Sequence, residues 1–173
     1  MHKLYKLSLA SVVCLGLSTA AFASINANVS YFSQSYGDGL KATGTRFNLG
    51  LGFSPWDLAK VKITLGPEFS YADGSLNRSV NYSNSYYDLT AGLFGEVDLQ
   101  LDNFQPYLRL STGYAGAKFY NQRYLGGVYS QVGIGAKLFG TFSAGVDYRY
   151  THLSNKDRSY NGNAYSFYVG ISF

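Results

Sequence analysis

The sequence predicts an all-β protein, an eight-stranded antiparallel transmembrane β-barrel. Three observations predict it: residues alternate between apolar and polar in eight separate runs, aromatic residues collect at the run ends, and short connections alternate with long ones. Only 14% of the 173 residues are charged, whereas 17% are aromatic. This composition excludes a disordered tail and a nucleic-acid-binding arm. The mean hydropathy of −0.08 is too low for a helical membrane protein.

The N-terminal segment predicts a secretory signal peptide. Two lysines precede the apolar run 7–17, and a cleavage site of small residues ends at Ala23. Removing these 23 of the 173 residues takes away two of the 14 basic side chains and leaves 12 against 10 acidic ones. We therefore expect a signal peptide over 1–23 and a barrel domain over 24–173. Its net charge of about +2 is too small to indicate a polyanion partner, and no nucleic-acid partner is expected.

The chain has one cysteine, Cys14, inside the apolar run of the signal peptide. The preceding residues Ser11-Val12-Val13 lack the small residue that a lipoprotein signal places directly before its cysteine, so a lipid anchor stays only as the alternative. After cleavage the barrel has no disulfide and no thiolate metal site. No metal-binding, phosphate-binding or dinucleotide motif occurs elsewhere, and no cofactor is expected.

Alternation with a period of two places successive side chains on opposite faces of a strand. The eight runs cover 25–31, 46–53, 61–71, 87–98, 108–114, 128–138, 142–151 and 165–173. Phe94 is an exception on the polar side, and Pro67 interrupts the third run, where we expect a bulge near Gly66 and Pro67. With about 19 residues per strand and connection, the domain has room for eight membrane strands of about 9 to 11 residues.

The two faces of these strands predict a membrane on the outside. One face is uniformly apolar and the other is small and polar, which is the inverse of a packed core. Two aromatic girdles are expected at the membrane interfaces, one of Phe53, Trp56, Phe104, Phe139, Phe142 and Phe173, the other of Tyr71, Tyr86, Tyr87, Tyr114, Tyr148, Tyr150 and Tyr165. Because lipid satisfies no backbone hydrogen bonds, the sheet must close on itself.

The connections predict the orientation. Those over 54–60, 100–103 and 140–141 are short and are expected in the periplasm, together with both termini. Four longer, polar loops are expected outside: Gly37 to Ala42, Ala72 to Ser85, Lys118 to Gly126 and Ser154 to Gly162. The loops carry more basic than acidic residues: Lys41, Arg78, Lys118, Arg123, Lys156 and Arg158 against Asp38, Asp73 and Asp157. These side chains are either drawn to anionic lipopolysaccharide or simply solvated.

Ten ionisable residues fall on the inward face, five of each sign: Arg46, Lys62, Arg109, Lys137 and Arg149 against Glu68, Asp88, Glu96, Asp98 and Asp147. Because side chains just fill an eight-stranded barrel, we expect a paired polar plug. Lys62 and Arg109 should meet the carboxylates of the fourth strand, Glu96 or Asp98. Arg46 should meet Glu68. A gated ion path is the alternative, and a lumen satisfied internally favours a monomer.

The whole barrel domain resembles the small outer-membrane barrels of Gram-negative bacteria, in particular the opacity-protein and OmpA-like families. The resemblance rests on the signal peptide, the eight runs, Pro106-Tyr107, the segment 148–151 and the terminal segment 165–173. It implies an outer-membrane location, contact with outer-membrane lipids and lipopolysaccharide, and recognition of Phe173 by the barrel-insertion machinery. It implies little about activity. The main interpretation is a structural or adhesin-like surface protein, with a host or matrix surface as a partner.

A second resemblance is local. The segment Thr151-His152-Leu153-Ser154-Asn155 resembles the His-x-Ser-Asn motif of the outer-membrane lipid A 3-O-deacylases, an eight-stranded family. It implies that His152 is a general base, that Ser154 is the nucleophile attacking an acyl ester, and that Asn155 shapes the oxyanion site. His152 and Ser154 continue the outward face of the seventh strand at its outer end, where lipopolysaccharide lies.

The match departs from that family at the residue that should orient the histidine. The deacylases have a Glu on the last strand, where this chain has Asn163 or Ala164, and Asp157 is the one acidic substitute nearby. Nucleophilic serine needs a base, and the base needs an orienting group. The alternative is that His152 is an interfacial ring and that Ser154 and Asn155 begin a turn.

Overall fold

The computed structural model describes residues 24–78, 83–119, 124–156 and 158–173. The predicted signal peptide with Cys14 lies outside the described residues, and so do Arg123 and Asp157.

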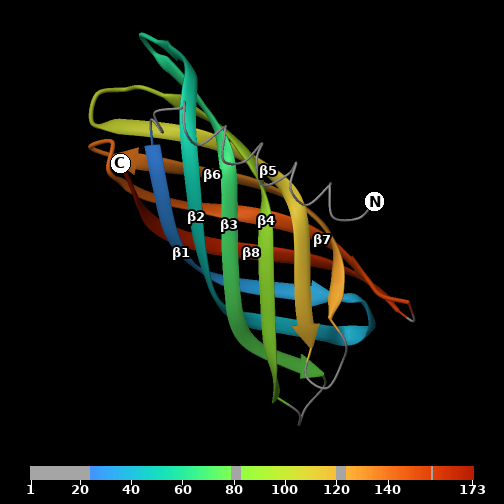
Figure 1. Ribbon diagram of the computed structural model, residues 1–173. Coiled ribbons are helices and arrows are strands. Elements are labelled where there is room, and N and C mark those ends of the chain that lie inside the picture. The colour runs from blue at the N-terminus through green and yellow to red at the C-terminus, as the bar shows by residue number, and fades with distance from the viewer. Residues whose placement is uncertain (1–23, 79–82, 120–123, 157) are drawn as a thin grey trace, which may run out of the picture.

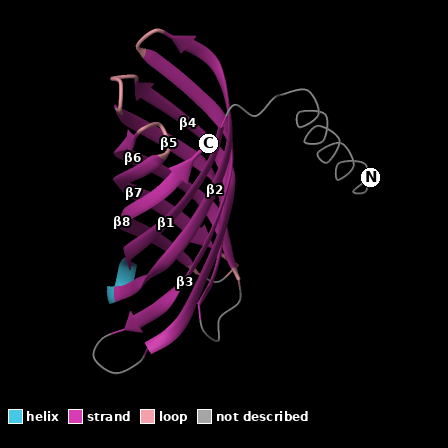
Figure 2. Ribbon diagram, turned by 90° about the vertical axis from the view of Figure 1, so that its left-hand side faces the viewer, coloured by secondary structure: helices cyan, strands magenta, loops and turns pink. Residues whose placement is uncertain are grey.

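Eight strands follow one another along the chain and confirm the predicted fold class (Figures 1 and 2). Residues Gly37–Gly39 form a single 3-10 turn, η1, between the first two strands. No helix of the described residues is long and apolar enough to cross a membrane. The strands are β1 Ser24–Tyr36, β2 Leu40–Leu58, β3 Val61–Arg78, β4 Ser83–Leu99, β5 Phe104–Phe119, β6 Leu125–Leu138, β7 Phe142–Ser154 and β8 Ser159–Ser172.

The sheet is a closed barrel in which each strand pairs antiparallel with the next and β8 pairs with β1. At the seam the backbones of Ile25 and Phe173 exchange two hydrogen bonds, of 2.8 and 2.9 Å. Figure 1 shows β1 beginning and β8 ending at the same end of the barrel. Following the predicted orientation, we call this the periplasmic end and the other the extracellular end.

The strands extend beyond the predicted runs at the extracellular end, which corrects the predicted loops. Pairing of β2 with β3 continues to Leu40 and Arg78, and pairing of β3 with β4 continues to Asn77 and Ser83. Most residues assigned to the loops 37–42, 72–85, 118–126 and 154–162 are therefore in strands. The physical reason is that the outward residues above the apolar belt are polar, so the alternation continues there without the apolar outward residues that marked the runs.

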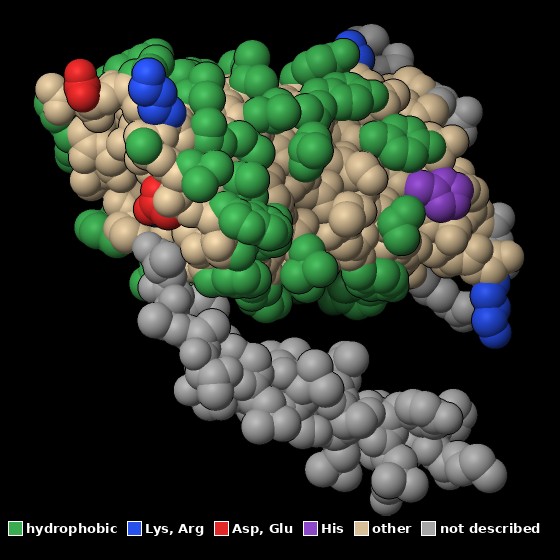
Figure 3. Space-filling model, turned by 90° about the horizontal axis from the view of Figure 1, so that it is seen from above, with side chains coloured by type: hydrophobic (Ala, Val, Ile, Leu, Met, Phe, Trp, Pro, Cys, Tyr) green, Lys and Arg blue, Asp and Glu red, His purple; other side chains and the backbone are tan. Residues whose placement is uncertain are grey.

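The outer wall has an apolar belt bounded by aromatic residues. All six residues of the Phe and Trp girdle are exposed on this wall, at the periplasmic end. The prediction that Tyr86 belongs to the tyrosine girdle is wrong, because Tyr86 is fully buried inside the barrel while its neighbour Tyr87 is exposed. Figure 3 shows the apolar side chains spread over the wall and the charged ones toward its two ends.

Above the tyrosines lies a ring of exposed polar residues, which we call the polar collar. Its outward position follows from the strand alternation, and it comprises Ser33, Ser35, Lys41, Thr45, Asp73, Asn77, Ser85, Lys118, His152, Ser154, Asn161 and Asn163.

The interior has two zones, whereas the sequence analysis predicted an inner face that is small and polar. The periplasmic half is polar and charged. The extracellular half is filled by a buried apolar cluster, which we call the apolar cap: Phe32, Tyr36, Leu40, Ala42, Ala72, Leu76, Tyr86, Ala115, Ala117, Leu125, Tyr129, Leu153 and Tyr160. The strands that carry the polar collar thus have a packed core behind them, as a soluble β-barrel does.

The irregularity in the sheet lies on β2 and not at the predicted Gly66–Pro67. The β2–β3 register shifts between Phe53 and Trp56, so that Ser54 and Pro55 form the bulge. At Gly66 the two strands come so close that an added Cβ would lie 1.8 Å from the carbonyl oxygen of Leu51. Glycine is therefore required before Pro67 because the neighbouring backbone leaves no room for a side chain.

Candidate functional site

A chain of ion pairs crosses the periplasmic half of the lumen. Lys137 Nζ donates to Glu96 Oε1 and to Asp98 Oδ1, both at 2.6 Å. Arg109 joins the other oxygen of Glu96, at 3.3 Å, to Glu68, at 2.8 Å. The Tyr129 hydroxyl completes the chain by donating to Glu68 Oε1 at 2.7 Å. Four strands, β3 to β6, thereby hold one another across the interior.

A second group lies above it, below the apolar cap. Arg46 Nη2 is 3.4 Å from Asp88 Oδ2, which also accepts a hydrogen bond of 3.0 Å from the Tyr86 hydroxyl. The Tyr86 and Tyr36 hydroxyls are 2.8 Å apart. Arg149 donates to Gln131 at 2.7 Å, and its guanidinium lies 4.6 Å from the centroid of the Tyr129 ring.

The pairing differs from the predicted one in three places. Arg46 meets Asp88 and not Glu68, because the register sets both opposite Ala72, whereas Glu68 lies four residues further along β3. Lys62 has no ion pair among the described residues, since Lys137 reaches the fourth-strand carboxylates instead. Asp147, which accepts a hydrogen bond from Ser166 at 2.7 Å, and Arg149, which donates to Gln131, are not in an ion pair with any described residue.

The exception on the inner face, Phe94, has a definite place in this network. It is 3% exposed, and the guanidinium carbon of Arg109 lies 3.9 Å from its ring centroid. Stacking on an aromatic face stabilises a desolvated guanidinium. An aromatic residue on the polar side of the fourth strand thus supports the central cation of the chain of ion pairs.

The His-x-Ser-Asn segment lies at the extracellular end of β7, in the polar collar. His152 is exposed, and its Nδ1 is 2.7 Å from Oδ1 of Asn161, directly opposite on β8. The Tyr150 hydroxyl donates to the same Asn161 oxygen at 3.1 Å. An amide oxygen can only accept here, so this contact fixes the proton of the neutral imidazole on Nδ1 and leaves Nε2 as the basic nitrogen.

Sequence reasoning missed Asn161. Of the two predicted positions for the orienting group, Asn163 lies opposite Tyr150 and accepts from Tyr148 at 2.6 Å, and Ala164 is buried in the lumen. Asp157 lies outside the described residues. The β7–β8 hairpin could have indicated Asn161. Ser154 pairs with Ser159, so two residues further from the turn on each strand His152 lies opposite Asn161.

Ser154 is exposed on the same face as His152 and is the last residue of β7. Among the described residues no hydrogen bond joins its hydroxyl to His152. Side chains at i and i+2 of a strand are about 7 Å apart along it, and a change of rotamer brings Ser154 Oγ toward the imidazole. Asn155 begins the turn to β8, with Oδ1 accepting from the backbone N–H of Arg158 at 2.8 Å.

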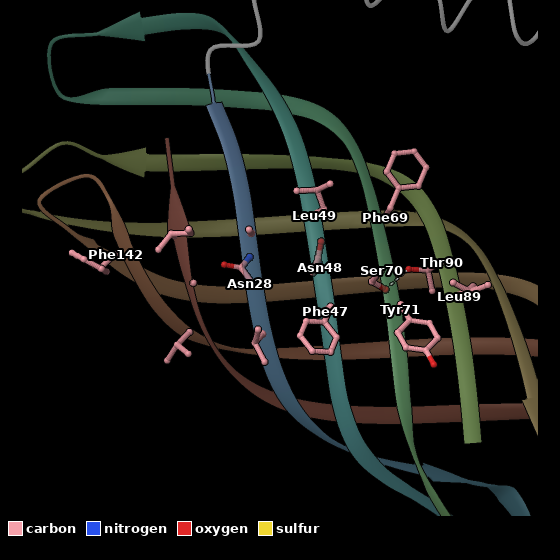
Figure 4. A pocket seen from close by; sticks show the side chains of 15 residues that line it. Asn28, Phe47, Asn48, Leu49, Phe69, Ser70, Tyr71, Leu89, Thr90 and Phe142 are labelled. Atoms are coloured by element: carbon pink, nitrogen blue, oxygen red, sulfur yellow. Dashed lines mark hydrogen bonds between the residues drawn. The ribbon is translucent and has the colours of Figure 1, made fainter. Parts of the chain in front are cut away.

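A shallow apolar depression of about 830 Å³ lies on the membrane-facing wall of β1 to β4 and β8. Figure 4 shows Phe47 and Leu49 on β2 beside Phe69 and Tyr71 on β3, with the inner hydroxyls of Ser70 and Thr90 hydrogen-bonded behind them. It belongs to the belt that faces lipid and contains no charged group. Among the described residues no cluster of His, Cys, Asp or Glu could hold a metal ion.

No protein-family model and no curated protein matches the chain. Solved structures do match. The outer membrane enzyme PagL aligns with a TM-score of 0.56 and 18% identity over 83% of this chain and 98% of PagL. Neisserial surface protein A aligns with a TM-score of 0.58 and 13% identity over 86% and 94%. Ail of Yersinia pestis, in complex with the heparin analogue sucrose octasulfate, aligns with a TM-score of 0.50 and 14% identity over 87% and 97%.

At such identities the likeness concerns the fold. All three structures are small barrels of the outer membrane, and this chain closes eight strands around a filled lumen with an apolar, aromatic-bounded outer wall. The chain therefore has the fold of the small eight-stranded outer-membrane β-barrels.

Proposed function

We propose that this protein is a surface barrel that acts through its extracellular end and does not conduct. The sealed lumen carries the proposal: the chain of ion pairs fills the periplasmic half, and the apolar cap fills the extracellular half. An apolar core and a set of buried, ion-paired side chains that fill the space between the strands both oppose the passage of ions. What remains available to other molecules is the polar collar and the turns above it.

The chemistry of that end favours an anionic partner. Four described basic residues are exposed there, Lys41, Lys118, Lys156 and Arg158, against one exposed described acid of the collar, Asp73. Lys118 is held 5.4 Å from the centroid of the Tyr124 ring. One structural neighbour, Ail, was crystallised with a heparin analogue. We infer that the polar collar, together with Lys156 and Arg158 in the turn above it, binds anionic saccharides, either the phosphorylated sugars of lipopolysaccharide or the sulfated glycans of a host or matrix surface.

Neutralising these four residues tests the surface role. For the variant K41Q/K118Q/K156Q/R158Q we expect elution from heparin at a lower salt concentration, because fewer cations face the polyanion and salt screens those that remain. Folding is checked by heat-modifiable mobility, and Lys60→Gln in a periplasmic turn is the control for loss of a lysine outside the collar. Equal retention of the quadruple variant and the wild type would exclude the collar as the binding surface.

A second function is favoured by one observation, the 2.7 Å contact between His152 and Asn161. It orients the imidazole in the tautomer that a general base needs, which is the role the deacylases give to a glutamate. An amide oxygen orients the ring without adding a charge. Both residues and Ser154 are exposed just above the tyrosine girdle, and such a girdle is expected at the membrane interface, where the headgroups lie. We infer that the second function is hydrolysis of an acyl ester of lipid A, with Ser154 as the nucleophile.

Ser154→Ala tests this activity in a Gram-negative host that lacks its own deacylase. Expression of the wild type should remove one hydroxyacyl chain from lipid A, seen by mass spectrometry, and the variant should leave lipid A intact because it has no nucleophile. Asn161→Ala should reduce the conversion by about 10- to 100-fold through loss of ring orientation. Unchanged lipid A with folded wild-type barrel in the membrane would exclude the hydrolase and leave the surface role.

A further inference from the structure

We propose that Tyr114 is a third group of the His152–Ser154 site and that its hydroxyl donates a hydrogen bond to the carbonyl oxygen of the ester. The proposal rests on the hydrolase function inferred above. It adds a donor that neither the His-x-Ser-Asn motif nor the strand pattern points to, because Tyr114 comes from β5, two strands away from β7.

The register brings Tyr114 toward this site. Tyr114 lies opposite Val128 on β6, and Val128 lies opposite His152 on β7. Two residues further along β6, Gly126 lies opposite Ser154. Tyr114, Val128 and His152 are all exposed on the outer wall, and Gly126 shares the face of Val128. Gly126 is thus the outward residue of β6 that lies beside Ser154.

The tyrosine ring reaches diagonally across β6 into the space that this glycine leaves open. A Cβ built on Gly126 would lie only 2.0 Å from the Tyr114 hydroxyl oxygen and 3.0 Å from its Cζ. The hydroxyl therefore occupies the place of the missing side chain. Since directly opposite Cβ atoms are about 4.5 to 5.5 Å apart, the hydroxyl faces the Ser154 side chain across a gap that one carbonyl group spans.

Both hydroxyls are available. Among the described residues, neither Tyr114 nor Ser154 makes a side-chain hydrogen bond, whereas Tyr148 and Tyr150 of the same girdle donate to Asn163 and Asn161. Tyr114 is 61% exposed, so a lipid ester can reach it. The motif's own candidate for the oxyanion site, Asn155, lies in the turn after Ser154, where its side-chain oxygen accepts from the backbone N–H of Arg158, whereas the Tyr114 hydroxyl approaches Ser154 from the side of β6. Tyr114 supplies a donor where one is needed.

The chemistry balances with water as the second substrate. Ser154 Oγ forms a bond to the ester carbonyl carbon while its proton moves to His152 Nε2, and the carbonyl oxygen becomes an oxyanion that accepts a hydrogen bond from the Tyr114 hydroxyl. Collapse breaks the bond to the alcohol oxygen, which takes the proton from Nε2 and leaves. Water, deprotonated by Nε2, then attacks the acyl-serine, which releases the fatty acid and restores the Ser154 hydroxyl.

Two substitutions test the hydroxyl in purified, folded protein acting on lipopolysaccharide. Tyr114→Phe keeps the ring and removes the donor, and loss of one oxyanion donor lowers kcat by about 10²- to 10³-fold with little change in KM. Gly126→Ala inserts the Cβ that would meet the hydroxyl and should lower kcat similarly by displacing it. Tyr165→Phe, in the same girdle, is the matched control and should keep wild-type kcat.

The outcomes separate this inference from the function on which it rests. Wild-type hydrolysis that is lost in Ser154→Ala and falls in both Tyr114→Phe and Gly126→Ala supports it. Wild-type hydrolysis lost in Ser154→Ala but unchanged in Tyr114→Phe overturns the role of Tyr114 and leaves the hydrolase. Absence of wild-type hydrolysis overturns both.

Discussion

Arg109→Ala should destabilise the barrel by about 3 to 5 kcal/mol, the cost of leaving buried charges without their partner. The guanidinium is buried, joins Glu68 to Glu96 and stacks on Phe94. Its removal leaves Glu68 without its cation, leaves Lys137 as the one cation of Glu96 and Asp98, and opens a cavity beside the ring. Unfolding by guanidinium chloride in lipid vesicles measures the loss through the emission of Trp56, the single tryptophan, which is exposed on the lipid-facing wall.

A compensating variant makes this prediction specific for charge. Arg109→Met combined with Glu68→Gln removes one charge of each sign and keeps the Tyr129 contact possible, so it should recover more than half of the lost stability. If Arg109→Ala costs less than about 1 kcal/mol, the lumen is solvated and the sealed-barrel proposal is wrong. The same result would restore the ion path as the interpretation of the inward charges.

Gly127→Ala should cost about 3 kcal/mol, the upper end of the usual range for overpacking, because the clash is with backbone. An added Cβ would lie 1.7 Å from the carbonyl oxygen of His152 and 3.0 Å from Cα of Leu153. Neither atom can move without shifting β7, so the contact of His152 with Asn161 should be lost as well. Urea unfolding reports the stability, and lipid A conversion reports the histidine.

Gly116 on β5 provides the matched control. A Cβ there would meet nothing closer than 4.0 Å, the carbonyl oxygen of Leu89. Gly116→Ala should therefore be neutral or slightly stabilising, because alanine has fewer unfolded conformations to lose than glycine. Equal stability of the two alanine variants would mean that β6 and β7 are not held as closely as the structure has them.

The fold was predictable because its determinant, the period of two, is local. Each of the eight runs lies within one strand, and the apolar parity marks the wall that faces lipid. The extensions beyond the membrane were missed because the outward residues there are polar, as at Asp73 and Asn77, while Ala72 and Leu76 turn inward. The alternation continues, but the outward residues are now polar and the inward ones apolar. A search for apolar outward residues therefore ends each strand too early.

The contacts of the site were less predictable because they depend on distances between strands. Arg109 and Glu68 come from strands that are not neighbours, so their contact depends on barrel width and side-chain length, which a linear pattern does not contain. Predicting the contact between Asn161 and His152 required the length of the turn that follows β7. Tyr114 required both the register of two hairpins and a residue without a side chain, Gly126.

The seam between β1 and β8 has a consequence for how the chain reaches its membrane. β8 is synthesised last, so β1 has no partner on one edge until Phe173 is available to exchange hydrogen bonds with Ile25. A sheet in which β8 has not yet paired with β1 has two unpaired edges beside its apolar outer face. Such edges recruit other strands. Pairing of β8 with β1 removes the last two free edges, so closure of the barrel depends on its last strand.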